Sequence, residues 1–435
     1  MRIALLSYRS KPHCGGQGVY VRHLSRGLAR LGHEVEVFSG PPYPELDPGV
    51  TLTRVPSLDL YRDPDPFRTP RPSEIRDWVD VLEVAAMWSA GFPEPLTFSL
   101  RAARILAERA DEFDVVHDNQ CLGYGLLQIQ RAGLPVVATI HHPITRDRAL
   151  DLAAAPWWKK VTVRRWYGFL TMQGRVARRI STLLTVSRSS EEDIAAAFTI
   201  PAGRLHTIPL GVDTDVFAPP AARTAVSEPD GPRRIACVAS ADMPLKGVGT
   251  LLEAVAKLRT EYDVRLTLVS KLTPGGATEQ LMDQLSIRDV VDVVSGIDDA
   301  ALAARLGEAD IACVPSLYEG FSLPAVEAMS CGTPLVASAA GAIPEVVGTD
   351  GASATLVRPG DVGAFVEALA DLLEDDALRA RMGAAGRERV LRDYSWDSVA
   401  AKTVERYAAA IEKSAPDGQA EPDGTPPAEQ RAVEA

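Results

Sequence analysis

Residues 316–338 read SLYEGFSLPAVEAMSCGTPLVAS, and this stretch decides the fold that we expect. Its first carboxylate, Glu319, stands where a buried strand at 311–315 gives way to a loop, and Glu327 falls within the helix that follows. Gly320 lets the backbone approach a ligand closely, and Pro324 has the fixed φ angle suited to a first helical turn. The stretch therefore predicts a strand, a ligand-facing loop and a helix in succession.

The same stretch has the chemistry to hold a particular kind of ligand. Free N–H groups at a helix start can hold a phosphate, and carboxylates accept hydrogen bonds from hydroxyl groups. A molecule with sugar rings on both sides of a diphosphate fits that arrangement. A surface helix with two solvated glutamates is the alternative, but it leaves the Gly-Phe-Ser-Leu-Pro insert and the small residues at 331–334 unexplained.

The size and the charge of the chain exclude several classes of protein. A length of 435 residues is too great for one core and predicts two domains. The net charge of −12 argues against a nucleic-acid partner, which requires a basic surface. Five scattered cysteines indicate reduced thiols rather than a disulfide framework or a metal cluster. The first residues read as a short strand rather than a secretory signal, and no apolar run is long enough to span a membrane. We therefore expect a cytoplasmic protein.

Short apolar runs alternate with helical patterns through most of the chain, which predicts two α/β domains with doubly wound parallel sheets. In such domains ligands bind in a cleft at the carboxyl ends of the strands. The expected organisation is an N-terminal domain at 1–217 with a proline-rich insertion of long loops at 41–97, a linker at 218–233, a second domain at 234–394, and a disordered tail at 414–435.

The segment YEGFSLPAVE, followed by EAMSCGTPLVAS and GAIPEVVG, resembles the E-x7-E element of the retaining GT-B glycosyltransferases of family 4. The resemblance covers residues 1 to 413 and is tightest over 234–360. It implies the GT-B fold, two Rossmann-like domains that face each other across a cleft, with helix 395–413 crossing back to the first domain. It also implies transfer of a sugar from a UDP- or GDP-linked donor to a hydroxyl acceptor, such as a lipid or glycan precursor.

The resemblance assigns donor-binding roles in the second domain. Glu327 would hold the ribose hydroxyls, Glu319 would contact the hydroxyls of the donor sugar, and Lys246 would neutralise the diphosphate as it leaves. The backbone amides that would face the sugar and the diphosphate are those of Gly320, Phe321, Ser322 and Leu323.

The chain departs from the family pattern just before Lys246. Where the family usually has Gly-Arg, with the arginine also gripping the diphosphate, this sequence has Ser240 and Ala241. Lys271, at the end of the next strand, is a candidate replacement for the arginine, and a solvated surface lysine is the alternative interpretation.

In the first domain, the resemblance places the glycine loop, the ends of two strands and a serine at the cleft. Asn119 stands where the family often has a second histidine, and Ser187 is either a cleft residue or the N-cap of the helix behind it. The resemblance assigns donor binding to Gly15, Gly16 and Gly18 of the loop and to Asn119 at a strand end, and it assigns catalytic roles to His117 and His141 beside the catalytic residues Lys246 and Glu319. A dinucleotide site is the weaker interpretation, because GGQGVYV lacks the G-x-G-x-x-G spacing.

The family mechanism implies neither a metal ion nor a cofactor. The acceptor hydroxyl attacks on the face that the diphosphate leaves, and the departing phosphate oxygen takes the acceptor proton. Paired carboxylates of the glycosidase kind are unnecessary, so Glu319 is not expected to be a nucleophile.

Residues 152–190 carry eight lysines and arginines and no acid. Val163, Trp166, Tyr167 and Leu170 lie at helical spacing on one face, which is typical of a helix at the surface of an anionic bilayer. This segment predicts peripheral association with the inner membrane face. The alternative is a helix packed on its own domain.

Two other functions remain open at this point. A GT-B epimerase or a phosphorylase would share the architecture, and a catalytically weak sugar-nucleotide-binding subunit would explain Asn119 and Ala241. The sequence specifies neither the sugar, the nucleotide, the acceptor nor the oligomeric state.

Overall fold

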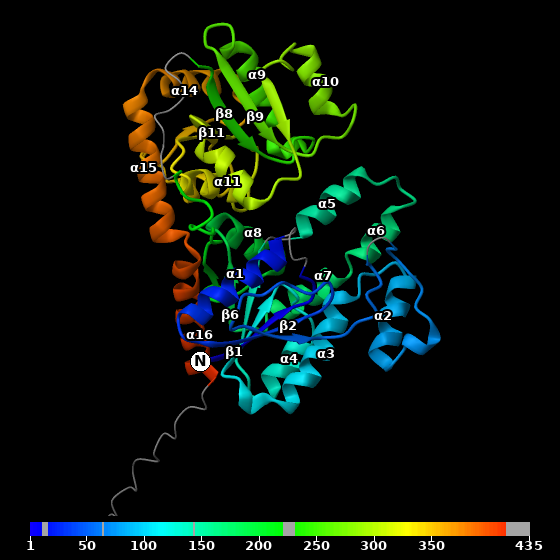
Figure 1. Ribbon diagram of the computed structural model, residues 1–435. Coiled ribbons are helices and arrows are strands. Elements are labelled where there is room, and N and C mark those ends of the chain that lie inside the picture. Colours follow the sequence, from blue (N-terminus) through cyan, green and yellow to red (C-terminus); the bar gives the residue numbers. More distant parts are fainter. Residues whose placement is uncertain (11–15, 63–64, 142–143, 221–230, 415–435) are drawn as a thin grey trace, which may run out of the picture.

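The computed structural model describes residues 1–10, 16–62, 65–141, 144–220 and 231–414. They form two α/β domains, which lie one above the other in Figure 1. The N-terminal domain contains a parallel sheet in the order β3-β2-β1-β4-β5-β6-β7. Its strands are β1 (Arg2–Ser7), β2 (Glu34–Ser39), β3 (Thr51–Arg54), β4 (Val115–Asn119), β5 (Val136–Ile140), β6 (Thr182–Thr185) and β7 (Leu205–Thr207).

The C-terminal domain repeats this topology with a parallel sheet in the order β10-β9-β8-β11-β12-β13. Its strands are β8 (Arg233–Val238), β9 (Val264–Val269), β10 (Val291–Val294), β11 (Ile311–Val314), β12 (Leu335–Ser338) and β13 (Thr355–Val357). The strand order reverses between β1 and β4 in one sheet and between β8 and β11 in the other. Loops diverge at such a reversal and leave a crevice at the carboxyl ends of the strands, so each domain brings one prepared binding edge.

The helices connect successive strands. In the N-terminal domain they are α1 (Gly16–Arg30), α2 (Trp78–Trp88), α3 (Glu94–Glu108), α4 (Gly125–Arg131), α5 (Thr145–Ala154), α6 (Lys160–Trp166), α7 (Phe169–Ala177) and α8 (Arg188–Phe198). In the C-terminal domain they are α9 (Val248–Leu258), α10 (Ala277–Gln284), α11 (Asp299–Gly307), α12 (Leu323–Ser330), α13 (Ile343–Val347), α14 (Val362–Glu374) and α15 (Asp376–Asp393).

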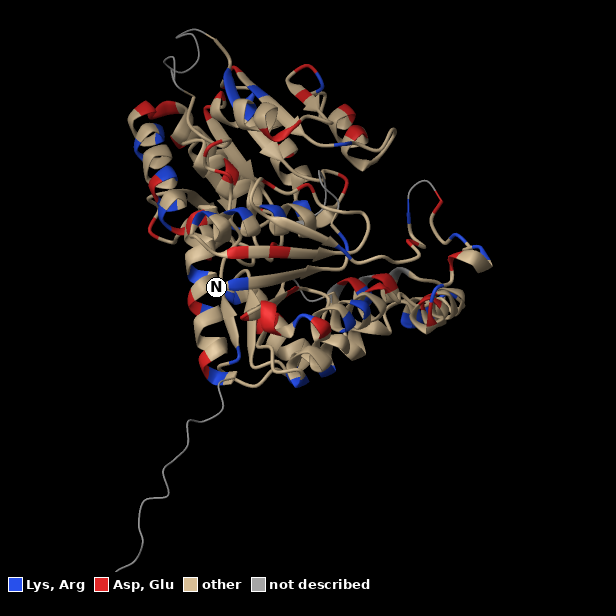
Figure 2. Cartoon of the chain, turned by 60° about the horizontal axis from the view of Figure 1, so that its bottom comes forward, with Lys and Arg blue, Asp and Glu red and all other residues tan. Residues whose placement is uncertain are grey.

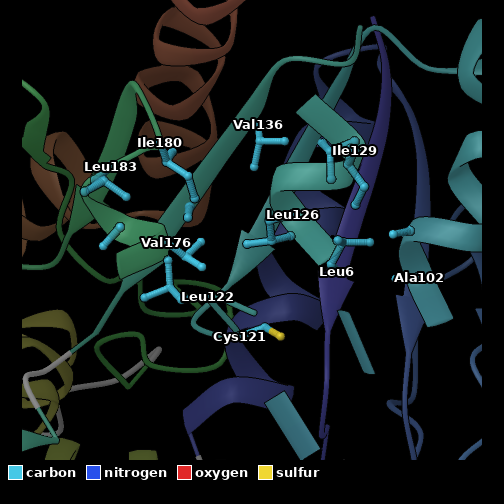
Figure 3. Close-up of a cluster of buried hydrophobic side chains, with 14 of the residues drawn as sticks. Leu6, Ala102, Cys121, Leu122, Leu126, Ile129, Val136, Val176, Ile180 and Leu183 are labelled. Carbon is cyan, nitrogen blue, oxygen red and sulfur yellow. The ribbon is translucent and has the colours of Figure 1, made fainter. Parts of the chain in front are cut away.

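The core of the N-terminal domain lies where apolar strand residues meet the apolar sides of the connecting helices. Figure 3 shows Leu6 of β1 and Val136 of β5 near Leu126 of α4, with Val176 of α7 nearby. All four side chains are buried. Because strands covered on both faces are apolar throughout, β5 reads VVATI and every residue of it is buried. This packing fixes the strand ends that form the cleft.

The segment 41–97 differs from the loops that its prolines suggested, because it contains β3, α2 and the start of α3. Helix α2 begins after Asp77, whose carboxylate accepts hydrogen bonds from the backbone N–H groups of Val79 and Asp80. Val84 and Met87 are buried on the inner side of the helix. The N-cap and the apolar residues therefore suffice for a helix between the prolines.

The last helix, α16 (Trp396–Ser414), belongs in space to the first domain. It packs along α1 and contacts β4 and β5, and Figure 1 shows it continuing from α15 down one side of the molecule. Tyr407 is fully buried there. Most of the expected linker, at 221–230, and the tail after 414 lie outside the described residues.

Charge is spread over the surface. Figure 2 shows acidic and basic segments interspersed on both domains, without a continuous basic face in that view. None of the helices that the structure describes combines the length and the apolar character that crossing a membrane requires.

Candidate active site

A cleft opens at the carboxyl ends of β8, β9 and β11, at the reversal point of the second sheet. It has a volume of about 400 Å³. Its lining residues are Val238, Ala239, Ser240, Lys246, Val269, Ser270, Lys271, Val314, Pro315, Ser316, Glu319 and Pro324. Two residues expected to bind the donor, Lys246 and Glu319, are thus brought together with the candidate replacement cation Lys271.

Lys246 and Glu319 form an ion pair in this cleft. The Lys246 Nζ lies 2.8 Å from Glu319 Oε1, and the Ser316 hydroxyl donates a hydrogen bond of 2.8 Å to the same oxygen. Glu319 is 8% exposed, whereas Lys246 is partly buried. A carboxylate held by two donors has a fixed orientation and can still accept hydrogen bonds through its second oxygen.

Two glycines allow the backbones around this pair to touch. Gly247 has a φ angle of +61°, and an added Cβ would lie 2.1 Å from the carbonyl oxygen of Pro315. Gly341 has a φ angle of +54°, and its added Cβ would lie 2.2 Å from the carbonyl oxygen of Glu319. The Ala342 N–H donates to that oxygen at 2.9 Å. Only glycine fits at both positions, so the loops that carry Lys246 and Glu319 are held against neighbouring backbone.

Glu327 lies on α12, and its side chain is partly buried. Burial raises the pKa of its carboxyl to about 7, and Asp299 nearby adds to the rise. Within the described part of the chain, its oxygens have no hydrogen-bond partner. A partly buried carboxylate without a protein partner is available to a ligand, and ribose hydroxyls could donate hydrogen bonds to it.

The segment Gly320–Leu323 leads into α12 without lining the cavity itself. Leu323 begins the helix and Pro324 stands in its first turn, facing the cleft. Phe321 packs against the ring of Tyr394, with centroids 6.0 Å apart, so its side chain belongs to the domain core. The Ser322 hydroxyl is buried and lacks a hydrogen-bond partner in the described part of the structure.

In the N-terminal domain, Asn119 and His141 lie together where β4 and β5 end. The His141 Nε2 lies 2.7 Å from Asn119 Oδ1, and the Asn119 amide donates to the carbonyl oxygen of Gln17 at 3.4 Å. Asn119 is fully buried, whereas His141 is partly exposed. The backbone N–H of His141 also donates to Gln120 Oε1. This network joins the ends of β4 and β5 to the first turn of α1.

The glycine loop is described only in part. Gly16 begins α1 and Gly18 stands in its first turn, next to Gln17. Gly15 lies outside the described residues. The described part places the N-terminus of α1 beside Asn119, which is where the sequence put the loop.

His117 does not reach the cleft, and the catalytic role given to it from the sequence is not supported. Its side chain is fully buried, with Nδ1 2.6 Å from the Tyr407 hydroxyl and Nε2 2.7 Å from the Thr139 hydroxyl. Burial, with a smaller contribution from His141, lowers its pKa to about 3. A neutral imidazole with both nitrogens engaged joins β4, β5 and α16 and has no free site for a substrate.

Ser187 is the N-cap of α8 and also contacts the second domain. Its oxygen accepts from the Ser190 N–H at 3.0 Å, as an N-cap of α8, and its hydroxyl donates to the carbonyl oxygen of Gly320 at 2.6 Å. The Ser190 hydroxyl donates to the same carbonyl at 3.1 Å. The N-terminal domain therefore holds the loop between Glu319 and α12.

Other contacts across the domains escaped the sequence analysis. The Tyr318 hydroxyl donates to Asp193 at 2.7 Å, and the Arg188 N–H donates to the carboxylate of Glu345 at 2.9 Å. Tyr318 and Glu345 lie inside the two motifs that carry the family resemblance. The motifs therefore marked Tyr318 and Glu345 as residues of interest. The sequence did not indicate that they contact Asp193 and Arg188 of α8.

The face of α6 and α7 that was expected to meet a bilayer packs inward instead. The Trp166 ring lies 5.2 Å from that of Phe92 and 5.7 Å from that of Tyr61, and Leu170 is 3% exposed. The apolar residues of 163–170 thus lie on the side of the two helices that packs against the rest of the N-terminal domain.

Comparison with known proteins agrees with this architecture. Residues 14–216 match the family "Glycosyltransferase Family 4", and residues 221–389 match "Glycosyl transferases group 1". Sucrose-phosphate synthase from Thermosynechococcus elongatus superposes with a TM-score of 0.68 and 25% identity, over 95% of this chain and 99% of that one. HepE of Anabaena, in complex with UDP, gives a TM-score of 0.65 with 16% identity, over 94% and 100% of the two chains. The protein thus has the GT-B fold of sugar transferases.

A relative from Mycolicibacterium hassiacum, an MMP α-(1→4)-mannosyltransferase, is 62% identical over 416 residues, which span 95% of this chain and all of that protein. The chain therefore belongs to glycosyltransferase family 4. It is an enzyme that transfers a sugar, so the epimerase, the phosphorylase and the inactive subunit are not needed to explain it.

Proposed function

We propose that the protein transfers a mannosyl group from a nucleoside-diphosphate sugar to a hydroxyl of a glycan acceptor, with retention of the anomeric configuration. The mannosyl group and the glycan acceptor are suggested by the 62% identical relative, which is an α-(1→4)-mannosyltransferase. The observation that carries the donor side is the Lys246–Glu319 ion pair in the cleft at the reversal point of the second sheet.

The chemistry follows from what these groups can bind. Glu319, oriented by Ser316 and Lys246, accepts a hydrogen bond from a hydroxyl of the donor sugar. The Lys246 ammonium stabilises the negative charge that develops on the departing diphosphate. The phosphate oxygen then takes the proton of the attacking hydroxyl, so no side chain needs to act as a base.

We also propose that this transfer requires neither a metal ion nor a cofactor. Cationic side chains in the cleft supply the charge that a divalent ion would otherwise supply. Transfer rates measured with and without excess EDTA test this statement. A rate that falls with EDTA and returns with a divalent cation would contradict it.

The test of the function is sugar transfer by the purified chain to a short α-mannoside. A thermal-shift screen of UDP- and GDP-linked sugars comes first, because a ligand that binds the native state raises Tm. With the donor so found, Glu319→Ala should lower kcat/KM about 100-fold, and Glu367→Ala, an exposed glutamate on α14, should not. Absence of transfer from every nucleotide sugar by the wild type would reject the proposal.

We further propose that the exposed residues at 157–164 of the N-terminal domain form a surface that associates with an anionic bilayer. Just before α6, Trp157 is 83% and Trp158 is 59% exposed, and Val161 in the first turn of the helix is 71% exposed. Lys159 lies over the ring of Trp158, and Arg164 is exposed on the same helix. Exposed tryptophans beside cations complement an interface of acyl chains and negative headgroups.

Vesicle flotation tests this surface. The wild type should float with phosphatidylglycerol vesicles and not with neutral phosphatidylcholine vesicles. Replacing both tryptophans (Trp157→Ser with Trp158→Ser) should abolish flotation, whereas Trp78→Ser, a change at an exposed tryptophan on α2, should not. If the wild type fails to bind either vesicle, or if the double variant floats equally well, the surface has another role.

A further inference from the structure

The donor cleft contains two lysines with different surroundings. The charge of Lys246 is compensated, because its ammonium pairs with Glu319 at 2.8 Å. Lys271 lines the same cleft, its side chain is exposed, and within the described part of the chain it forms no ion pair with a carboxylate. The cleft therefore has one cation already engaged and one that is free to bind an anion.

Lys271 is also held beside the position where the family arginine is missing. The Ala241 N–H donates to Ser270 Oγ at 3.0 Å, which joins the loop after β8 to the end of β9. Asp242 accepts from the backbone N–H of Thr273 at 2.7 Å, and this interaction lowers its pKa to about 2. Lys271 lies between these two anchors, so its backbone is fixed next to Ala241.

The charge balance of the cleft depends on Lys271. Without it, Lys246 and Glu319 cancel, and the cavity offers a diphosphate no net positive charge. With it, the cavity is positive overall, although the whole chain has a net charge of −12. An ammonium binds phosphate as a point charge and needs no bidentate geometry, so a lysine can supply the attraction that an arginine supplies elsewhere.

We propose that Lys271 binds the diphosphate of the donor in this protein. It would replace the family arginine, whose position is occupied here by Ala241. The inference rests on the proposed function, because it assumes that a nucleoside-diphosphate sugar occupies the cleft. It divides the work between two lysines. Lys271 supplies ground-state attraction for the diphosphate, and Lys246 acts on the leaving group from its place beside Glu319.

Calorimetric titration of the full chain with GDP, UDP, GMP and UMP at one ionic strength tests this division. Lys271→Ala should weaken the binding of the preferred nucleoside diphosphate about tenfold, and that of the matching monophosphate by less than about twofold. Lys271→Arg should restore most of the affinity, because it keeps the charge. Lys257→Ala, at an exposed lysine on α9, is the matched control and should bind as the wild type does.

The outcomes are distinguishable. If the wild type binds a nucleoside diphosphate and Lys271→Ala binds it equally well, the assignment of Lys271 is wrong while the proposed function stands. An equal loss for monophosphate and diphosphate would also overturn it, because the change would then act on the nucleoside. A wild type that binds none of the four nucleotides would instead count against the proposed function.

Discussion

The two walls of the cleft use different chemistry. The C-terminal wall has charged groups, with Lys246, Lys271 and Glu319 around one cavity. The N-terminal wall presents amides and a partly exposed imidazole, with Asn119 bonded to His141. In a transfer reaction negative charge develops on the leaving diphosphate, whereas the acceptor stays neutral. Under the proposed function, the difference teaches that charge is concentrated where charge develops, while neutral hydrogen bonds orient the other substrate.

The largest effect is expected for a variant that removes the positive charge of Lys246. Lys246→Ala should lower kcat by about 10²- to 10³-fold, because the leaving group loses its counter-charge and Glu319 loses a donor that orients it. Initial rates at saturating donor measure this loss, with Lys257→Ala as the control. A decrease in kcat of less than about fivefold would mean that the charge of Lys246 contributes little to the departure of the diphosphate.

A smaller effect separates the two histidines of the acceptor wall. His117→Leu leaves the Tyr407 hydroxyl unpaired in the core and removes one of the two partners of the Thr139 hydroxyl, so it should destabilise the protein by about 1–3 kcal/mol, with kcat changed less than about threefold. His141→Ala should do the reverse, lowering kcat/KM about tenfold with little change in Tm. Thermal unfolding and kinetics of both variants make the comparison.

His117 should also make the stability of the protein depend on pH, and the direction of this dependence follows from its pKa. The pKa of His117 is lowered to about 3 in the native state, so below its ordinary value of 6.5 the unfolded chain binds the proton that the native state excludes. Its contribution to stability is therefore complete above pH 6.5 and falls as the pH decreases towards 3. His117→Leu should show a shallower loss of Tm between pH 7 and pH 5. Parallel curves for the variant and the wild type would mean that His117 is solvated.

The smallest expected effect concerns Glu327, whose pKa is raised to about 7. The native state then binds a proton that the unfolded chain releases above pH 4.5, so stability decreases as the pH rises from 4.5 to 7. Glu327→Gln removes this cost, and its Tm should exceed that of the wild type by a few degrees, on the order of 2–4 °C, at pH 8 but not at pH 5. Calorimetric scans without ligand provide the measurement. Equal Tm values at both pH values would show that a partner satisfies the carboxylate.

The sequence predicted the fold from local patterns, and its resemblance to family 4 assigned the donor-binding residues of the second domain. Buried strands that end in glycine-bearing loops predicted the two sheets, and the spacing of Glu319 and Glu327 predicted a strand end and a helix. The partner of His117 could not be predicted in this way. Tyr407 lies 290 positions further along the chain, and only the return of α16 brings it to β4. The same holds for the hydroxyl of Ser190, which meets Gly320 only when the domains pack together.

The amphipathic spacing at 163–170 was recognised, but it left open whether a bilayer or the protein's own domain covers that face. A periodic pattern shows that one face of a helix avoids water, and it does not show what covers that face. Here Phe92 and Tyr61, from the segment expected to be loops, cover Trp166. The loops expected at 41–97 and the bilayer surface considered for 163–170 therefore concern two segments that pack against each other.

The course of α16 has a consequence for biosynthesis. Val399, Ala400 and Tyr407 complete the hydrophobic core around β1 and α1, although they lie in the last helix that the structure describes. The domain that begins synthesis cannot reach its final packing until almost the entire polypeptide has left the ribosome. The second domain, whose sheet is continuous in sequence, can fold first and carry the closing helix back to its partner.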